Sequence, residues 1–225
     1  MPRCVVTRLE PERPRSRRTV LELDDERVRF MPASLVARLG LEAGDSVDPG
    51  VLADQAAMLE PELARERALY LLSYRERSVG ELRAKLADDG YDDDVTAAVV
   101  ARLAELGLVD DVRFAEALAR MLRARSYGRS RIARELSRHH IGDELALAVL
   151  EESVPTDDES ERALELARRA VRGRSLTVDR LAGRLARKGF RAGTAIAAAS
   201  QAIEEAGSHA TSGADGGYDG DPGGP

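Results

Sequence analysis

Ser78–Tyr91, with the sequence SVGELRAKLADDGY, decides the fold because the chain contains this stretch three times in diluted form. Leu82 aligns with Ile132 and Leu181, and a fixed period of about fifty residues is typical of a repeat protein. The neighbours follow the same register: Leu86 with Leu136 and Leu185, Tyr91 with Ile141 and Phe190, Ser78 with Gly128 and Thr177, and Gly90 with His140 and Gly189.

A helix is predicted upstream of this stretch in each repeat. Its apolar residues recur at i, i+4, i+7 and i+8, which indicates a helix with one buried face. The three sets are Ala64, Ala68, Leu71 and Leu72; Phe114, Leu118, Met121 and Leu122; and Ala163, Ala167, Ala170 and Val171.

Capping signals divide each repeat into three helices. Ser78 and Glu81 have the spacing of a capping box, and Gly90 suits the left-handed residue that ends a helix. Asp92–Asp94 supply the N-cap of a third helix. The same signals predict that helices start at Asp110 or Asp111, Ser130, Asp143, Asp157 and Thr177. They predict that helices end at Gly107, Gly173 and Gly189.

The third helices carry the weakest apolar pattern. Val95, Val99, Leu103 and Leu106 form the expected stripe in the first repeat. In the third repeat, strict alignment selects Thr194, Ala198 and Ala202, whereas a small shift would select Ile196, Ala199 and Ile203.

The N-terminal region has a different pattern. Strands are expected over 4–10, 17–23 and 27–31, followed by a short helix from Ser34 to Gly40. A hairpin or three-stranded sheet with a helix against it is the predicted form. A helix over 51–58 should then lead to Pro61, with the first repeat helix over 62–73.

The sequence therefore predicts a mainly α protein, in which three tandem three-helix repeats form an elongated curved array. The repeats stack because each exposes an apolar face that a neighbour covers. The predicted boundaries are 1–61 for the β-containing region, 62–111, 112–153 and 158–206 for the repeats, and 207–225 for a disordered Gly- and Asp-rich tail.

Composition limits the classes of protein that fit. The chain has 225 residues, 43% apolar, with no Trp and one cysteine, Cys4. No apolar run approaches the roughly 20 residues of a membrane helix, and no secretory signal is recognised. A single cysteine fits a reducing cytoplasm, where we expect a monomer that does not contact the membrane.

The net charge of −6 hides a segregation of charge along the chain. Residues 62–111 contain twelve acidic and seven basic side chains, a balance of −5. Residues 113–138 contain eight arginines and two glutamates, a balance of +6, and residues 162–191 contain ten basic and two acidic side chains, a balance of +8. The second and third repeats are therefore candidates for binding an acidic partner.

No pattern indicates an enzyme, a cofactor or a metal site. The sequence has no phosphate loop, no GxSxG, no HExxH and no cysteine pair. His139 and His140 are adjacent, so they point in different directions on a helix, and Asp92–Asp94 are explained by helix capping. We expect no catalytic residues and no bound metal.

One sequence pattern does indicate a functional surface, namely an arginine face on the second helix of the second and third repeats. Arg131, Arg134 and Arg138 share one face opposite Ile132 and Leu136. Such a face is either solvated surface or a site for a polyanion or an acidic protein. The candidate partner-binding residues are Arg131, Arg134, Arg138, Arg180, Arg184, Arg187 and Arg191, extended by Arg120, Arg123, Arg168 and Arg172.

The stretch LYLLSYRERSVGELRAKLADDGY, followed by GLVDDVRFAEA at 107–117, resembles the RecX family of regulators of the RecA recombinase. The resemblance covers about residues 62–206. It implies a crescent of three-helix units in the groove of the RecA filament on single-stranded DNA, which suppresses filament growth, ATP hydrolysis, strand exchange and repressor cleavage.

Two other classes of function remain open from the residues alone. Three-helix units resemble helix-turn-helix modules, so the chain could bind DNA directly. It could also be a helical adaptor that binds only proteins. Binding to bare single-stranded DNA, compared with binding to a preformed filament, separates these alternatives.

Overall fold

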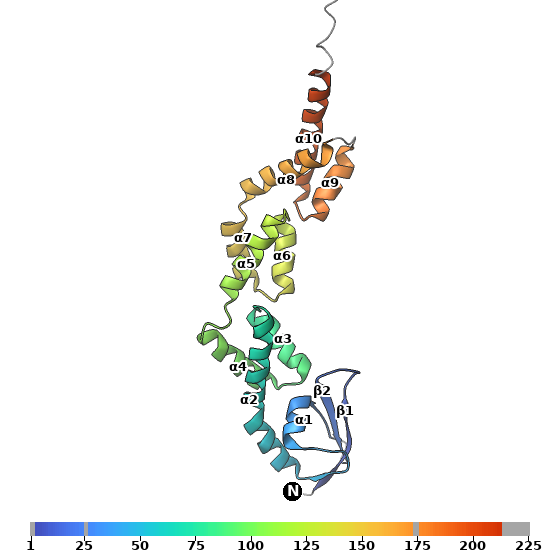
Figure 1. Cartoon of the computed structure of the whole chain (residues 1–225), viewed down its shortest axis with the longest axis vertical. Helices are drawn as coiled ribbons and strands as arrows, with labels where there is room; N and C mark the ends of the chain where they lie inside the picture. Colours follow the sequence, from blue (N-terminus) through green and yellow to red (C-terminus); the bar gives the residue numbers. More distant parts are fainter. Residues whose placement is uncertain (1–2, 25–26, 173–175, 213–225) are drawn as a thin grey trace, which may run out of the picture. The chain divides into compact units, whose positions relative to one another are not determined.

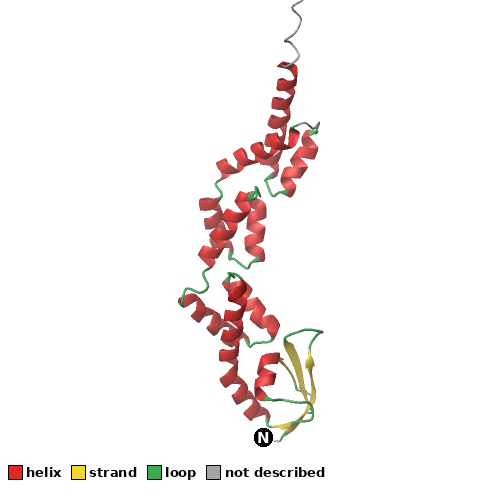
Figure 2. Cartoon of the chain, in the orientation of Figure 1, coloured by secondary structure: helices red, strands yellow, loops and turns green. Residues whose placement is uncertain are grey.

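The computed structural model describes residues 3–24, 27–172 and 176–212. The chain divides into two units, Met1–Phe114 and Ala115–Pro225, and each is considered by itself. Within the described residues, strands occur only in the first unit, whereas helices make up the repeats of both (Figures 1 and 2). The mainly α fold with a small N-terminal sheet is confirmed.

The N-terminal sheet has four antiparallel strands in the order β3-β2-β1-β4. The strands are β1 (Cys4–Pro11), β2 (Arg18–Leu23), β3 (Val28–Pro32) and β4 (Ser46–Val47). The two-residue β4 pairs with the start of β1 and was not predicted, since two residues are too few for a periodic signal.

One face of this sheet is covered by helices. Helix α1 (Ala33–Leu39) follows β3 directly and ends at Gly40, which has a φ of 65°. Leu35 of α1 and Leu52 of α2 (Pro49–Tyr74) pack with Val6, Leu21 and Met31 of the sheet in one buried core.

The first repeat begins on a helix that is longer than predicted. Helix α2 runs unbroken from Pro49 to Tyr74, with Pro61 in its interior. The expected break at Pro61 was wrong. A proline in this position removes one backbone hydrogen bond, but each half of α2 is packed: Leu52 lies in the sheet core, and Ala64 and Ala68 lie in the repeat core.

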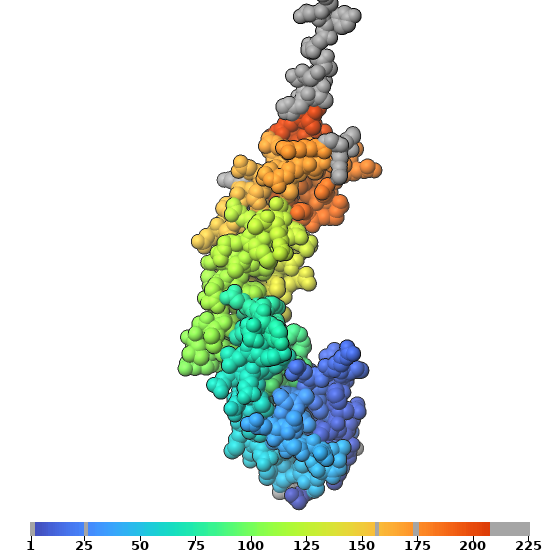
Figure 3. All heavy atoms as spheres, in the orientation of Figure 1, coloured from blue at the N-terminus to red at the C-terminus, as the bar shows by residue number. Residues whose placement is uncertain are grey.

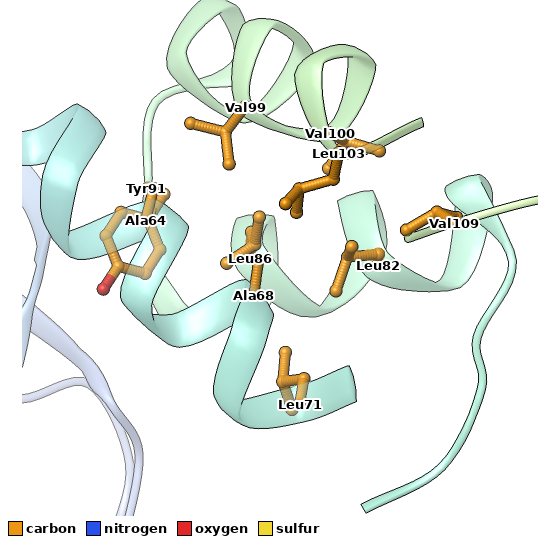
Figure 4. Packing of buried hydrophobic residues seen from close by; sticks show 10 residues of the cluster. All are labelled: Ala64, Ala68, Leu71, Leu82, Leu86, Tyr91, Val99, Val100, Leu103 and Val109. Atoms are coloured by element: carbon orange, nitrogen blue, oxygen red, sulfur yellow. The ribbon is translucent and has the colours of Figure 1, made fainter. Parts of the chain in front are cut away.

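Helices α3 (Val79–Asp89) and α4 (Asp93–Glu105) complete this repeat. Ser78 caps α3 by accepting a hydrogen bond from the Glu81 amide, and Gly90 ends it with a φ of 94°. Leu82 and Leu86 point from α3 into the core between α2 and α4, where they meet Val100 and Leu103 (Figure 4).

The stripe predicted for α4 needs correction at one end. Val99 and Leu103 are buried, but Leu106 is 55% exposed. Leu106 is the C-cap residue, so its side chain leaves the helical register, and Val109 from the following loop fills the core instead.

The second repeat consists of α5 (Asp111–Ala124), α6 (Arg129–Arg138) and α7 (Asp143–Ser153). Asp110 caps α5 by accepting a hydrogen bond from the Arg113 amide. Phe114 and Leu122 of the predicted stripe on α5 are buried, but Ala115 and Ala119 are buried as well, whereas Met121 is exposed. The upstream helix is therefore shifted by one residue relative to the alignment of the second helices.

The third repeat consists of α8 (Thr156–Val171), α9 (Val178–Arg187) and α10 (Ala192–Ser212). Pro155, and not Asp157, is the N-cap of α8, and the predicted helix end at Gly173 lies outside the described residues. Thr177 caps α9 as predicted. On α10 the unshifted positions Ala198 and Ala202 are buried together with Ala199, whereas Ile196 is exposed.

The predicted disordered tail begins too early in the sequence. Helix α10 continues through Gly207 to Ser212. Gly costs only about 1 kcal/mol relative to Ala in a helix, so a single glycine within an Ala-rich segment does not end it. Residues 213–225, to which the rest of that prediction applies, lie outside the described residues.

The first and third repeats have separate cores. Leu82 belongs to one and Leu181 to the other. The boundaries predicted for the repeats remain predictions. No helix among the described residues is long and apolar enough to span a membrane.

Replacing Leu86 with Ala should destabilise the first unit by about 2–5 kcal/mol, because the side chain is completely buried and its removal leaves a cavity. Urea unfolding followed by circular dichroism measures this. Leu147→Ala on α7 is the control, since Leu147 is exposed, and it should change stability by less than about 0.5 kcal/mol. Equal losses would contradict the assignment of the core.

Candidate partner-binding surface

Helices α6 and α9 each present an arginine-bearing face opposite a buried face. On α6, Ile132 and Leu136 are buried, whereas Arg134 and Arg138 are exposed. On α9, Leu181 and Leu185 are buried, and the three arginines of its opposite side are exposed. Both helices reach the surface on the same side of the second unit (Figure 3).

The arginines of α6 are partly occupied by contacts within the unit. Glu135 lies 3.5 Å from the Arg131 guanidinium and 3.4 Å from that of Arg138. Arg131 also stacks over the Tyr127 ring at 4.7 Å. Among the described residues, the Arg134 side chain bonds only the Ser130 carbonyl, at 3.3 Å. One carboxylate thus offsets part of the charge of this face.

The arginines of α9 are the least restrained. Within the part of the chain that the structure describes, the side chains of Arg180, Arg184 and Arg187 form no ion pair, and all three are exposed. Arg191, just before α10, is also exposed. This face therefore presents exposed arginine side chains that are not engaged in ion pairs among the described residues.

The arginines predicted on the upstream helices extend the patch less than expected. Arg120 pairs with Glu116 at 3.2 Å. Arg123 pairs with Asp158 at 2.9 Å, and Arg168 binds both carboxylate oxygens of Glu205 at 2.7 Å. Arg172, the C-cap residue of α8, is exposed. Three of these four arginines are thus engaged in ion pairs.

The two arginine-bearing helices meet end to end. The Gly128 amide donates to the Lys188 carbonyl at 2.9 Å, and the Ser130 amide donates to the Gly189 carbonyl at 3.1 Å. The first amides of a helix and the last carbonyls of a helix have no partners within it. Here the start of α6 and the end of α9 satisfy each other, which fixes the second repeat against the third.

This contact requires glycine on both sides. A Cβ added at Gly128 would collide with the Gly189 carbonyl and the Phe190 amide. A Cβ added at Gly189 would collide with the Arg131 backbone, and Gly189 also has a φ of 92°. Only backbones without a side chain approach this closely.

Three cations stabilise the same junction by capping helix ends. The Arg162 guanidinium donates to the Tyr127 carbonyl at 2.5 Å, and the Lys188 ammonium donates to the Arg125 carbonyl at 3.3 Å, both at the end of α5. Arg129 donates to the Leu150 and Val154 carbonyls at 2.6 and 2.9 Å, at the end of α7. Cations at these C-termini complement the helix dipole.

Ion pairing and burial shift two pKa values at the junction. The hydrogen bond from Arg123 lowers the pKa of Asp158, and Arg162 adds to this effect. Burial lowers the pKa of Arg162, and the charge of Asp158 opposes this shift. These groups position the repeats and belong to the structural framework.

A recurring carboxylate also links successive repeats, although it was not predicted from the sequence. Asp111 at the start of α5 accepts a hydrogen bond from the Val79 amide of α3 at 2.8 Å. Glu159 at the start of α8 accepts one from the Arg129 amide of α6 at 2.7 Å. An acidic side chain therefore caps the second helix of the preceding repeat. Aligning the buried residues Ala115 and Ala163 would have placed Asp111 opposite Glu159, because each acid lies four residues before its alanine.

The corresponding face of α3 differs in charge. Glu81 accepts two hydrogen bonds from Arg75, at 2.6 and 3.0 Å, and Asp88 pairs with Lys85 at 3.4 Å.

Among the described residues, no group of three or more His, Cys, Asp or Glu side chains is arranged to hold a metal ion.

Comparison with known families agrees with this architecture. The model of the RecX first three-helix domain matches residues 64–103, and that of the RecX second three-helix domain matches residues 110–150. Regulatory protein RecX of Mycobacterium avium (strain 104) is 38% identical over 137 residues, which cover 57% of this chain and 78% of that protein. The chain belongs to the RecX family.

Other RecX proteins match to a similar extent. Regulatory protein RecX of Stenotrophomonas maltophilia (strain K279a) is 41% identical over 129 residues, covering 56% of this chain and 78% of that protein. The protein of the same name from Mycolicibacterium smegmatis is 34% identical over 157 residues, covering 64% of this chain and 83% of that protein.

Two solved structures share the fold. A crystal structure of regulatory protein RecX has a TM-score of 0.54 and 22% identity, covering 85% of this chain and 96% of that one. The RecX structure from Lactobacillus salivarius has a TM-score of 0.55 and 24% identity, covering 65% of this chain and 96% of that one.

Replacing Gly128 with Ala should destabilise the second unit by about 1–3 kcal/mol, because the added methyl group forces the junction apart. The matched control is Gly193→Ala in the first turn of α10, where an added Cβ has no neighbour within 4 Å. This control should be neutral or slightly stabilising, by up to about 1 kcal/mol. Urea unfolding measures both, and equal stability of the two variants would contradict a close junction.

Proposed function

We propose that this chain regulates the RecA recombinase by binding to the RecA filament on single-stranded DNA. Membership of the RecX family, whose matched relatives are named regulatory proteins, supports a regulatory role. The resemblance further suggests a negative effect on filament growth, ATP hydrolysis, strand exchange and repressor cleavage. The proposal involves no catalytic step and no cofactor, and places the chain in the cytoplasm as a monomer.

The exposed arginines of α9 are the observation that carries this proposal. Arg180, Arg184 and Arg187 lie on a helix held in place by its buried face and its junction with α6. Guanidinium groups that have no carboxylate beside them are available to phosphates or to acidic side chains of a partner. The phosphate backbone of DNA and an acidic protein surface both fit this chemistry.

The pairing of the arginines favours the face of α9 over that of α6. Glu135 offsets charge on α6, and Arg131 is also held against Tyr127. No such carboxylate pairs with the three arginines of α9 within the described residues. We therefore assign the larger part of the binding to α9, with Arg134 and Arg138 of α6 as a secondary contact.

The triple variant Arg180→Glu, Arg184→Glu, Arg187→Glu should weaken inhibition of the RecA ATPase on single-stranded DNA by tenfold or more. One well-placed interface arginine contributes about 2 kcal/mol, and the substituted side chains would repel an acidic partner. The double variant Arg134→Glu, Arg138→Glu should have a smaller effect. Higher salt should weaken inhibition by the parent protein, because exposed charges are screened over about 10 Å at 0.1 M.

The matched control is the triple variant Arg65→Glu, Arg83→Glu, Arg102→Glu. It changes the net charge by the same amount using exposed arginines of the first unit. It should inhibit like the parent. Unchanged inhibition by the folded α9 variant would show that its arginines are only solvated surface.

Two binding measurements separate the other classes of function. A direct DNA-binding protein would bind duplex DNA without the recombinase as tightly as it binds the filament. A protein-only adaptor would bind the recombinase equally well with and without single-stranded DNA. Either result would contradict recognition of the assembled filament.

A further inference from the structure

One edge strand of the N-terminal sheet has an unpaired outer side. The strand order leaves β3 and β4 at the two edges. β4 has only two residues, and a very short edge strand is a common protection against further pairing, whereas β3 has five residues. Val28 and Phe30 of β3 are apolar and are 53% and 46% exposed. The edge at β3 is therefore a place where another strand can pair.

The ladder between β2 and β3 is hydrogen-bonded through the odd-numbered residues at both of its ends. The Leu23 amide donates to the Arg27 carbonyl at 3.0 Å, and the Ala33 amide donates to the Arg17 carbonyl at 2.7 Å. The register between these two bonds is unbroken. Bonded and non-bonded pairs alternate along an antiparallel ladder, so the odd-numbered residues of β3 bond β2.

The peptide groups of Val28 and Phe30 consequently point away from the sheet. Their amides and carbonyls have no hydrogen-bond partner within the part of the chain that the structure describes. An extended peptide presents donors and acceptors at the same two-residue spacing, which neither a nucleic acid nor a lipid does. The free peptide groups therefore select an extended polypeptide as the occupant of this edge.

A groove of about 630 Å³ runs along the free edge of β3. All the residues of 29–32 line it, although successive side chains of a strand point to opposite faces of the sheet. The edge is the part of the strand that these residues share. Ala56 and Glu60 of α2 and residues 90–93, where α3 ends and α4 begins, line the other side. This second wall favours a single extended segment over the edge of another folded sheet.

An unsatisfied hydrogen-bond donor lies beside the groove. Arg18 of β2 contributes to its lining, and the Arg18 guanidinium lies 4.2 Å from the centre of the Phe30 ring. The Arg18 Nε is buried and has no hydrogen-bond partner among the described residues. A buried donor without an acceptor costs free energy. A carbonyl or carboxylate of a segment bound along Phe30 would supply the acceptor.

The charges of the groove do not select its occupant by themselves. Arg18 and Arg29 lie on the strand side, whereas Glu60, Asp92 and Asp93 lie on the opposite wall. The carboxylates of Glu60 and Asp92 already accept hydrogen bonds from backbone amides, at 2.6 and 2.9 Å. Cations and carboxylates are thus both present, and the row of free peptide groups is the feature that identifies the kind of partner.

We propose that an extended segment of the recombinase binds in this groove and adds to the sheet beside β3. The identity of the partner rests on the proposed function, whereas the extended form of the segment rests on the free peptide groups of Val28 and Phe30. In this mode of recognition, main-chain hydrogen bonds supply affinity and alternate side chains supply specificity. Side chains of the segment that share the face of Phe30 pack against its ring.

Amide hydrogen exchange of the full chain, with and without recombinase filaments on single-stranded DNA, tests this contact. In the free chain, the amides of Val28 and Phe30 should exchange rapidly, whereas those of Arg29 and Met31 are slowed by their bonds to β2 and serve as the internal control. Filaments should slow exchange at Val28 and Phe30 by about tenfold or more, because both amides then donate to the bound segment.

The other results of this measurement contradict the inference in distinguishable ways. Unchanged exchange at Val28 and Phe30, with slowed exchange elsewhere in the chain, overturns strand addition and leaves the proposed function standing. Unchanged exchange throughout the chain shows that it does not bind the filament, and then both fail. Exchange at Val28 and Phe30 that slows in the free chain as its concentration rises assigns the edge to a second copy, which also overturns the inference.

A pair of substitutions isolates one main-chain hydrogen bond. Phe30→Pro removes an outward amide but no bond to β2, and proline is tolerated at such positions of an edge strand. Phe30→Ala is the matched control, because it loses the ring and keeps the amide. Phe30→Pro should bind the filament about fivefold or more weakly than Phe30→Ala, since one backbone hydrogen bond is lost. Equal binding by the two variants, each shown by urea unfolding to be folded, would refute strand addition. If the proline variant does not fold, the exchange measurement on the parent decides.

Discussion

The structure of the second unit depends on the exchange of backbone hydrogen bonds between the end of α9 and the start of α6. Helix ends carry amides and carbonyls that have no partners within the helix, and burying them alone costs free energy. Joining Gly128 and Ser130 to Lys188 and Gly189 satisfies both sets at once. The exchange requires the backbones to touch, which explains the two glycines. It also holds the arginine-bearing helices α6 and α9 in a fixed relation.

Some basic side chains of the second unit are bonded within the unit, whereas others are exposed and unpaired among the described residues. Arg129, Arg162 and Lys188 bond carbonyls at helix ends, and Arg123 and Arg168 pair with carboxylates. These cations contribute to the charge balance of the sequence, but little of their bonding capacity is left for a partner. The arginines of α9 retain theirs. A surplus of basic residues in a sequence is thus a poor measure of the surface available to a polyanion, and the pairing of each guanidinium group has to be known.

The sequence predicted what depends on local periodicity. Leu82, Ile132 and Leu181 are all completely buried, as the repeat register required, and Ser78 and Thr177 cap the helices that they precede. Predictions that depend on packing between helices were less accurate. The unbroken α2 and the burial of Ala115 and Ala119 instead of Met121 follow from tertiary contacts, which override a single proline or a one-residue register. The arginine faces could be located from helical spacing, and so could the pairing of Glu135 with Arg131 and Arg138, which lie at i−4 and i+3 on the same helix. The pairing of Arg123 with Asp158 and of Arg168 with Glu205 could not, because those partners are distant in the sequence.

The first repeat shows again that charges counted along a sequence are not all available to a partner. Residues 62–111 have a negative balance, yet Asp89 and Glu81 are each paired with an arginine, Arg67 and Arg75. The guanidinium groups of α9 have no such partner among the described residues, so they can bind phosphate or carboxylate groups. Contacts of this kind position a protein on a phosphate backbone without reading the base sequence. The pairing of each charge, and not the sum of charges along the chain, therefore decides which surface can bind an acidic partner.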